Sequence, residues 1–86
     1  MVYKVKYTRR AEKVLEKHPE LKKFTTKAMK DISKNIQEAK SYDIKKLKGF
    51  KDIFRLRKGD YRVIFEVREN EFIIKVIEAN NRGDVY

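Results

Sequence analysis

The residues best suited to chemistry in this sequence are basic and crowd the segment 45–68. Nine basic residues stand there against three acidic ones, in a chain whose net charge is +10. Such a patch suits a polyanion, because neutralising phosphates releases condensed counterions. It equally suits an acidic protein partner drawn in by long-range attraction, and a solubilising surface is the third alternative. The nine residues are Lys45, Lys46, Lys48, Lys51, Arg55, Arg57, Lys58, Arg62 and Arg68.

Three of the arginines are predicted to share one side of a hairpin. Gly59-Asp60 joins two strand-like segments, and glycine at the first central position is typical of a type II′ turn. In this register Arg57 lies opposite Arg62, and Arg55 lies opposite Ile64. Side chains alternate between the two faces of a strand, so the three guanidinium groups share one face. The other face carries the apolar residues Phe54, Leu56, Val63 and Phe65.

The arginine cluster indicates a site for an anion. Like charges directly opposite each other weaken a sheet. Three guanidinium groups on one face therefore destabilise the sheet unless an anionic ligand binds them. The alternative is that they are splayed into water, where surface charges are screened.

The elements around this hairpin predict an α+β fold. An alternating strand at 2–7 is followed by Thr8, a good N-cap for a short helix that runs to about His18. Pro19 can open a second helix, whose apolar residues recur at three- and four-residue steps to about Ala39. The order β-α-α-β-β-β predicts two N-terminal helices packed on one face of a curled, mainly antiparallel four-stranded sheet. The last three strands are expected at 53–58, 61–68 and 72–79.

The composition of the chain excludes several classes of protein and of binding site. The length predicts a single domain over 1–86. The chain has no cysteine, which leaves no disulfide or thiolate metal site, and a single histidine, His18, argues against zinc. No apolar run approaches the roughly 20 residues that span a bilayer, and the first residues do not form a signal peptide. We therefore expect a cytoplasmic protein with no membrane contact, no metal and no cofactor.

Three segments of the chain resemble the signature of the RelE/ParE toxin superfamily: 46–50, 53–57 and 59–65. The closing Asn81-Arg82-Gly83-Asp84-Val85-Tyr86 resembles the end of RelE-type members, and the resemblance covers essentially the whole chain. The arginine and tyrosine of this ending favour the ribonuclease branch over the gyrase-poisoning ParE branch. The resemblance implies a toxin of a type II toxin–antitoxin system.

For a RelE-type toxin the resemblance implies a ribosome-dependent mRNA endonuclease that inhibits translation. Basic side chains on the open sheet face would hold mRNA in the decoding site, where a 2′-hydroxyl attacks the adjacent phosphate. Guanidinium groups stabilise the charge that builds up on the phosphoryl oxygens, and a tyrosine can stack on a base. The implied catalytic residues are Arg55, Arg57, Arg62, Arg82 and Tyr86. The implied phosphate contacts are Lys45, Lys46, Lys48 and Lys51.

This sequence departs from the family pattern in ways that leave the general base open. RelE members often carry lysines where Arg55 and Arg57 stand, and arginine is a poor base because its pKa lies above 12. Asn80 and Asn81 stand where the family often has a histidine. Glu66 shares the face of Arg62 by parity, either as a proton acceptor or as a salt-bridge partner. Two alternatives stay open: a ParE-type gyrase inhibitor, and a catalytically weak relative that binds RNA or an antitoxin.

The expected partners are an acidic, RelB-like antitoxin, the ribosome and mRNA. The open face should also carry the apolar residues Ile64, Ile73 and Ile77, and a surface that mixes apolar and cationic groups usually has a lid. We expect an acidic amphipathic helix or extended segment of the antitoxin to dock there.

Overall fold

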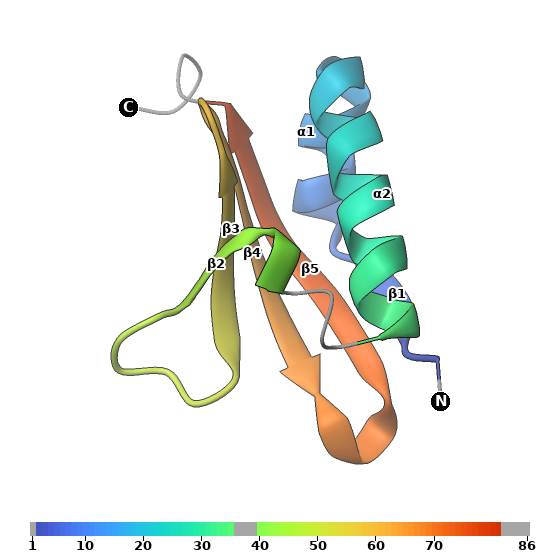
Figure 1. The fold of residues 1–86 in the computed structure, drawn as a ribbon. Coiled ribbons are helices and arrows are strands. Elements are labelled where there is room, and N and C mark those ends of the chain that lie inside the picture. Colours follow the sequence, from blue (N-terminus) through green and yellow to red (C-terminus); the bar gives the residue numbers. More distant parts are fainter. Residues whose placement is uncertain (1, 36–39, 82–86) are drawn as a thin grey trace.

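The computed structural model describes residues 2–35 and 40–81, and it contains a five-stranded mixed sheet with two helices (Figure 1). The α+β class is confirmed, whereas the expected four-stranded sheet is wrong by one strand. The strand order is β1-β5-β4-β3-β2, with β1 parallel to β5 and the other neighbours antiparallel. A one-turn 3-10 helix, Glu69–Glu71, joins the last two strands. The elements in order are β1 (Lys4–Tyr7), α1 (Arg9–Lys17), α2 (Pro19–Lys34), β2 (Asp43–Lys46), β3 (Ile53–Lys58), β4 (Tyr61–Arg68) and β5 (Ile73–Asn81).

The additional strand is β2, which pairs antiparallel with β3 at an edge of the sheet. Its register places Asp43 opposite Arg57 and Lys45 opposite Arg55. Ile44 is its inward residue, opposite Leu56. A short, charged strand is the usual way to finish a sheet edge, and with a single inward apolar residue it shows almost no periodicity of its own.

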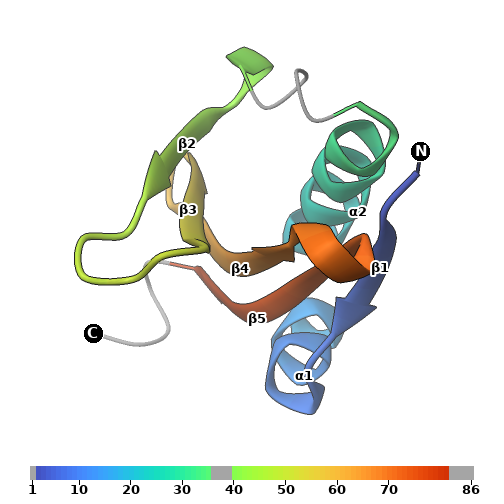
Figure 2. The ribbon, with the colours of Figure 1, turned by 90° about the horizontal axis from the view of Figure 1, so that it is seen from below.

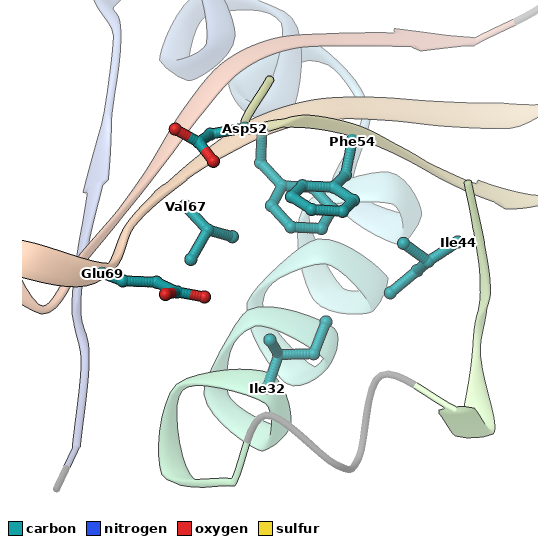
Figure 3. A pocket seen from close by; sticks show the side chains of 7 residues that line it. Ile32, Ile44, Asp52, Phe54, Val67 and Glu69 are labelled. Atoms are coloured by element: carbon teal, nitrogen blue, oxygen red, sulfur yellow. The ribbon is translucent and has the colours of Figure 1, made fainter. Parts of the chain in front are cut away.

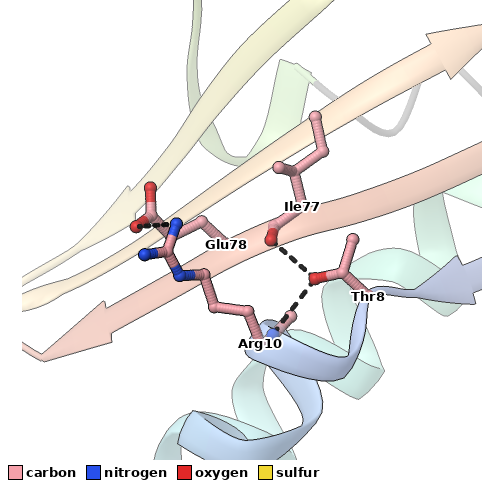
Figure 4. Close-up of polar contacts among 5 residues, drawn as sticks. Thr8, Arg10, Ile77 and Glu78 are labelled. Atoms are coloured by element: carbon pink, nitrogen blue, oxygen red, sulfur yellow. Dashed lines mark hydrogen bonds and ion pairs between the residues drawn. The ribbon is translucent and has the colours of Figure 1, made fainter.

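The two helices begin where the sequence predicts. The Thr8 hydroxyl oxygen accepts a hydrogen bond from the Ala11 N–H at 3.1 Å and donates one to the Ile77 carbonyl at 2.7 Å, which ties the start of α1 to β5 (Figure 4). Pro19 occupies the first turn of α2. That helix ends at Lys34 rather than near Ala39, because Asn35 adopts an extended conformation (φ −152°, ψ 110°).

The core lies between the helices and one face of the sheet. The sheet curls around α2, and α1 packs against α2 and β5 near the end of β1 (Figures 1 and 2). Every predicted inward residue of the hairpin except the half-buried Phe54 is fully enclosed. None of the helices in the described part of the chain is long and apolar enough to cross a bilayer. The buried apolar residues are Ala11, Leu15, Leu21, Ala28, Met29, Ile32, Leu56, Val63, Phe65, Val67, Ile74, Val76 and Ala79.

A β-bulge in β5 shows that the expected place of Ile77 on the open face is wrong. Ile64 pairs with Glu78 and Phe65 pairs with Val76, so Ile77 is an extra residue without a cross-strand partner. A bulge inserts one residue into one strand and shifts its alternation. Ile77 therefore does not belong to the regular open-face row.

The cap of α1 gives a stability prediction. Thr8→Ala removes both hydrogen bonds of the hydroxyl, and losing such an N-cap costs about 1–2 kcal/mol. The free energy of unfolding, measured by urea denaturation at unchanged m-value, should fall by that amount. Thr8→Ser keeps the hydroxyl and should stay close to wild type. Equal losses in the two variants would contradict the capping role.

Candidate nucleic-acid interface

The register of the central hairpin brings the three predicted arginines to one face. Arg57 lies opposite Arg62 and Arg55 lies opposite Ile64, as the sequence predicts. The residues that alternate with them, Leu56 and Val63, are fully buried on the helix side. The arginine face, which we call the open face, is therefore the side of the sheet that carries no core.

Two rows of side chains run across four strands of the open face. The first row is Asp43, Arg57, Arg62 and Asn80, and the second row is Lys45, Arg55, Ile64 and Glu78. Each row mixes cationic groups with a carboxylate at one end. The cationic groups gather on the two central strands and on β2.

Arg55 is the most enclosed arginine of the cluster. Its side chain is 18% exposed, and its Nη2 lies 3.4 Å from the Asp43 carboxylate on the edge strand. Its Nε is buried and has no hydrogen-bond partner within the described residues. A buried donor without a partner costs free energy. An oxyanion that reached this N–H would remove that cost.

The carboxylates farther along the open face are engaged by other cations. Glu66 accepts a hydrogen bond from Arg68 Nε at 2.7 Å, and Glu71 lies 3.5 Å from the same guanidinium. The hydrogen bond with Glu66 raises the pKa of Arg68 above its ordinary value. Glu78 lies 3.9 Å from Arg10 Nη1, which reaches it from the first turn of α1 (Figure 4). Glu66 is thus held in a salt bridge, the second of the two roles considered for it.

The predicted lysines do not all share the open face. Lys45 lies on it beside Arg55, whereas Lys46 lies opposite Phe54 and so belongs to the helix side. Lys48 and Lys51 are exposed in the loop between β2 and β3. The other two predicted site residues, Arg82 and Tyr86, lie outside the described residues.

Typical metal ligands do not gather in one place among the described residues. These residues contain no group of three or more histidine, cysteine or acidic side chains that could hold an ion. His18 caps the junction between α1 and α2, the helix-end position that the sequence indicates.

A small cavity of about 130 Å³ opens on the helix side of the sheet (Figure 3). Its apolar walls come from α2 and three strands, and two carboxylates, Asp52 and Glu69, lie at one side of it. It lies across the sheet from the arginines and has no cationic lining, so it is not the anion site. The apolar lining residues are Ile32, Ile44, Phe54, Phe65 and Val67.

Sequence reasoning missed Asp43, because it missed the strand that carries it. The available signal was the alternation of Tyr42 and Ile44 with Asp43 and Lys45. This pattern is too short to distinguish from a polar loop. Only pairing with β3 makes it a strand and places the carboxylate beside Arg55.

Comparison with known proteins identifies the family of the chain. Residues 5–86 match the family model described as ParE toxin of the type II toxin–antitoxin system parDE. No curated protein matches the chain in sequence.

Several solved structures share the fold. A chain of the archaeal RelE–RelB complex from Pyrococcus horikoshii OT3 is 28% identical, with a TM-score of 0.79 over 99% of this chain and 100% of that one. Chains of two other complexes are more distant and support the fold alone. The RelB–RelE complex from Methanococcus jannaschii gives 24% identity and a TM-score of 0.74, with 94% of each chain covered. The RelBE2 complex from Mycobacterium tuberculosis gives 21% identity and a TM-score of 0.74, covering 98% of this chain and 95% of that one.

The family model covers nearly the whole sequence, and the shared fold extends over the same residues. The chain therefore belongs to the RelE/ParE superfamily, in the family of ParE toxins of type II toxin–antitoxin systems.

Proposed function

We propose that this toxin is a ribosome-dependent endoribonuclease that cuts mRNA in the decoding site and so inhibits translation. The observation that carries the proposal is the gathering of Arg55, Arg57 and Arg62 on the open face. The buried Nε of Arg55 has no hydrogen-bond partner among residues 2–35 and 40–81, so it adds a donor that a phosphate oxygen can use. Guanidinium groups bind phosphate through paired, charge-assisted hydrogen bonds.

The proposed reaction is an internal transfer within the RNA. The 2′-oxygen forms a bond to the adjacent phosphorus as the bond to the 5′-oxygen breaks, which leaves a cyclic phosphate and a 5′-hydroxyl. The proton of the 2′-hydroxyl is lost and the 5′-oxygen gains one. Negative charge builds up on the phosphoryl oxygens in the transition state, and fixed cations lower its energy. We assign this role to Arg62 and Arg82, with Arg55 and Arg57 holding the backbone and Tyr86 stacking on a base.

The open face gives a physical reason for dependence on the ribosome. Its carboxylates within the described residues are Asp43, Glu66 and Glu78, and each lies in an ion pair with an arginine. Arginine itself is a poor general base. Catalysis then rests on charge stabilisation and on holding the RNA in a reactive geometry, which is worth several orders of magnitude when a scaffold supplies it. The ribosome would be that scaffold.

A gyrase inhibitor of the ParE type is the second candidate, because the matching family model carries the ParE description. Such a toxin blocks a protein and needs no RNA chemistry. A third possibility is a relative that binds RNA or antitoxin without cleaving. Cleavage of mRNA, inhibition of gyrase and binding of RNA, measured for the same protein, separate all three.

We further propose an acidic, RelB-like antitoxin as the partner of the open face. Chains of similar fold come from complexes of RelE with RelB. The open face carries Ile64 and Ile73 among its cations, and both are only half buried. A segment with apolar anchors and carboxylates would complement both features.

The first test compares two arginines of the same face. Arg57→Ala removes a guanidinium of the cluster, and the loss of charge-assisted hydrogen bonds of about 1.5–3 kcal/mol should slow cleavage of mRNA on translating ribosomes about 10- to 100-fold. Arg68→Ala is the control, because that guanidinium is held by Glu66 and Glu71. It should cleave within about threefold of wild type. Equal losses in the two variants would remove the special role of the cluster.

The second test uses the C-terminal residues. Primer extension on a translated message should show cleavage by wild type, loss in Arg82→Ala and reduction in Tyr86→Ala, because both side chains are assigned to the reacting phosphate and its base. DNA supercoiling by gyrase, assayed in parallel, should be unaffected by all three proteins. Gyrase inhibition that survives both substitutions, with messages left intact, would establish the ParE-type alternative. Binding to RNA without any cleavage would identify the third.

A further inference from the structure

The solvent face of α2 carries a row of lysines on the opposite side of the molecule from the arginines. Its members recur at steps of four, three and four residues, which places them on one line along the helix. All are exposed, and none forms an ion pair within residues 2–35 and 40–81. The row, which we call the lysine stripe, consists of Lys23, Lys27, Lys30 and Lys34.

The acidic residues of α2 form no ion pair with the stripe within the described residues, and each is engaged by a tyrosine from another element. Glu20 accepts a hydrogen bond from the Tyr61 hydroxyl at 3.0 Å. Asp31 accepts one from the Tyr42 hydroxyl at 2.6 Å. Like charges four residues apart destabilise a helix, and the helix dipole favours cations only in the last turn, at Lys34. Stability of α2 therefore does not account for the stripe.

The composition of this face distinguishes among anionic partners. A protein that docks on a helix usually needs apolar or aromatic anchors, and lysine is depleted at such interfaces. The exposed large apolar residues of the described chain are Val2, Phe50 and Phe72, and none lies on α2. The other exposed residues of α2 are Pro19, Glu20, Lys22 and Thr26, and none of them is a large apolar or aromatic residue. The absence of apolar anchors also disfavours an interfacial membrane helix.

Single-stranded RNA is a poorer fit than double-stranded RNA. Proteins that hold single strands use exposed aromatic side chains on which bases stack, and the stripe has none. Double-helical RNA is recognised through its shape and its phosphates. The stripe is straight and about 16 Å long at 1.5 Å per residue, so it can follow several successive phosphates.

We propose that the lysine stripe of α2 is a second RNA-binding surface, one that takes the phosphate backbone of a double-helical RNA. The sheet curls around α2 (Figure 2), so this surface and the open face point in different directions. The toxin could then hold a single-stranded message on one side and a structured RNA on the other. The proposal goes beyond the proposed cleavage, and its test measures binding alone.

The test uses a blunt RNA duplex and a single-stranded RNA oligomer as probes. The triple variant Lys23→Ala, Lys27→Ala and Lys30→Ala should lose at least about 10-fold in duplex affinity near 0.1 M salt. Its slope of log affinity against log salt should fall by about 2 to 3, since each phosphate contact contributes about 0.9 on a duplex. Its affinity for the single strand should stay within about twofold. Arg57→Ala should instead lose affinity for the single strand and keep its affinity for the duplex.

The matched control lowers the net charge by the same amount through substitutions outside the stripe. The triple variant Lys13→Ala, Lys17→Ala and Lys40→Ala removes three exposed lysines from outside the stripe and should keep duplex affinity within about threefold. Equal losses in the two triple variants would mean that overall charge, not the stripe, binds the duplex, and would overturn the proposal. The proposal would also be overturned if the stripe variant kept its duplex affinity but lost its binding to an acidic antitoxin or to anionic vesicles. If the wild-type protein did not cleave mRNA, this test would still be valid, because it measures duplex binding alone.

Discussion

The fold places Arg57 directly opposite Arg62 in adjacent strands, and the rest of the candidate site depends on that constraint. The register is set on the other face, where the rings of Phe54 and Phe65 stack with centroids 5.7 Å apart and Leu56 meets Val63. A slip by one residue would send these apolar side chains into water. The packing of the core thus places two cationic side chains opposite each other on the open face.

The distribution of acidic side chains explains why the excess positive charge of the chain is concentrated on two separate surfaces. Glu78 meets Arg10 and Glu66 meets Arg68, so both carboxylates serve cations outside the central cluster. The carboxylates of α2 accept hydrogen bonds from Tyr61 on β4 and from Tyr42, which directly precedes β2. Within the described residues the lysines on the outer line of α2 form no ion pair. On the open face, Asp43 of β2 lies opposite Arg57 and 3.4 Å from Arg55.

The hairpin and the helix starts could be predicted from sequence because local chemistry determines them. Gly59 has φ +57° while Asp60 has no positive φ, as a type II′ turn requires, and Thr8 caps α1 as expected. The strand at Asp43–Lys46, the parallel pairing of β1 with β5 and the bulge at Ile77 depend on contacts between distant segments. No short window of sequence contains those contacts. The ion pair of Arg55 with Asp43 could not be predicted for the same reason.

The proposed cleavage requires the clustered guanidinium groups to neutralise RNA phosphates together. The most direct measurement is the salt dependence of single-stranded RNA affinity for wild type and for the variant in which Arg55, Arg57 and Arg62 are all alanine. Each phosphate contact to a single strand contributes about 0.7 to the slope of log affinity against log salt. We expect the slope to fall by about 2 in the variant. An unchanged slope would contradict the claim, since it would mean that the cluster contacts no phosphate.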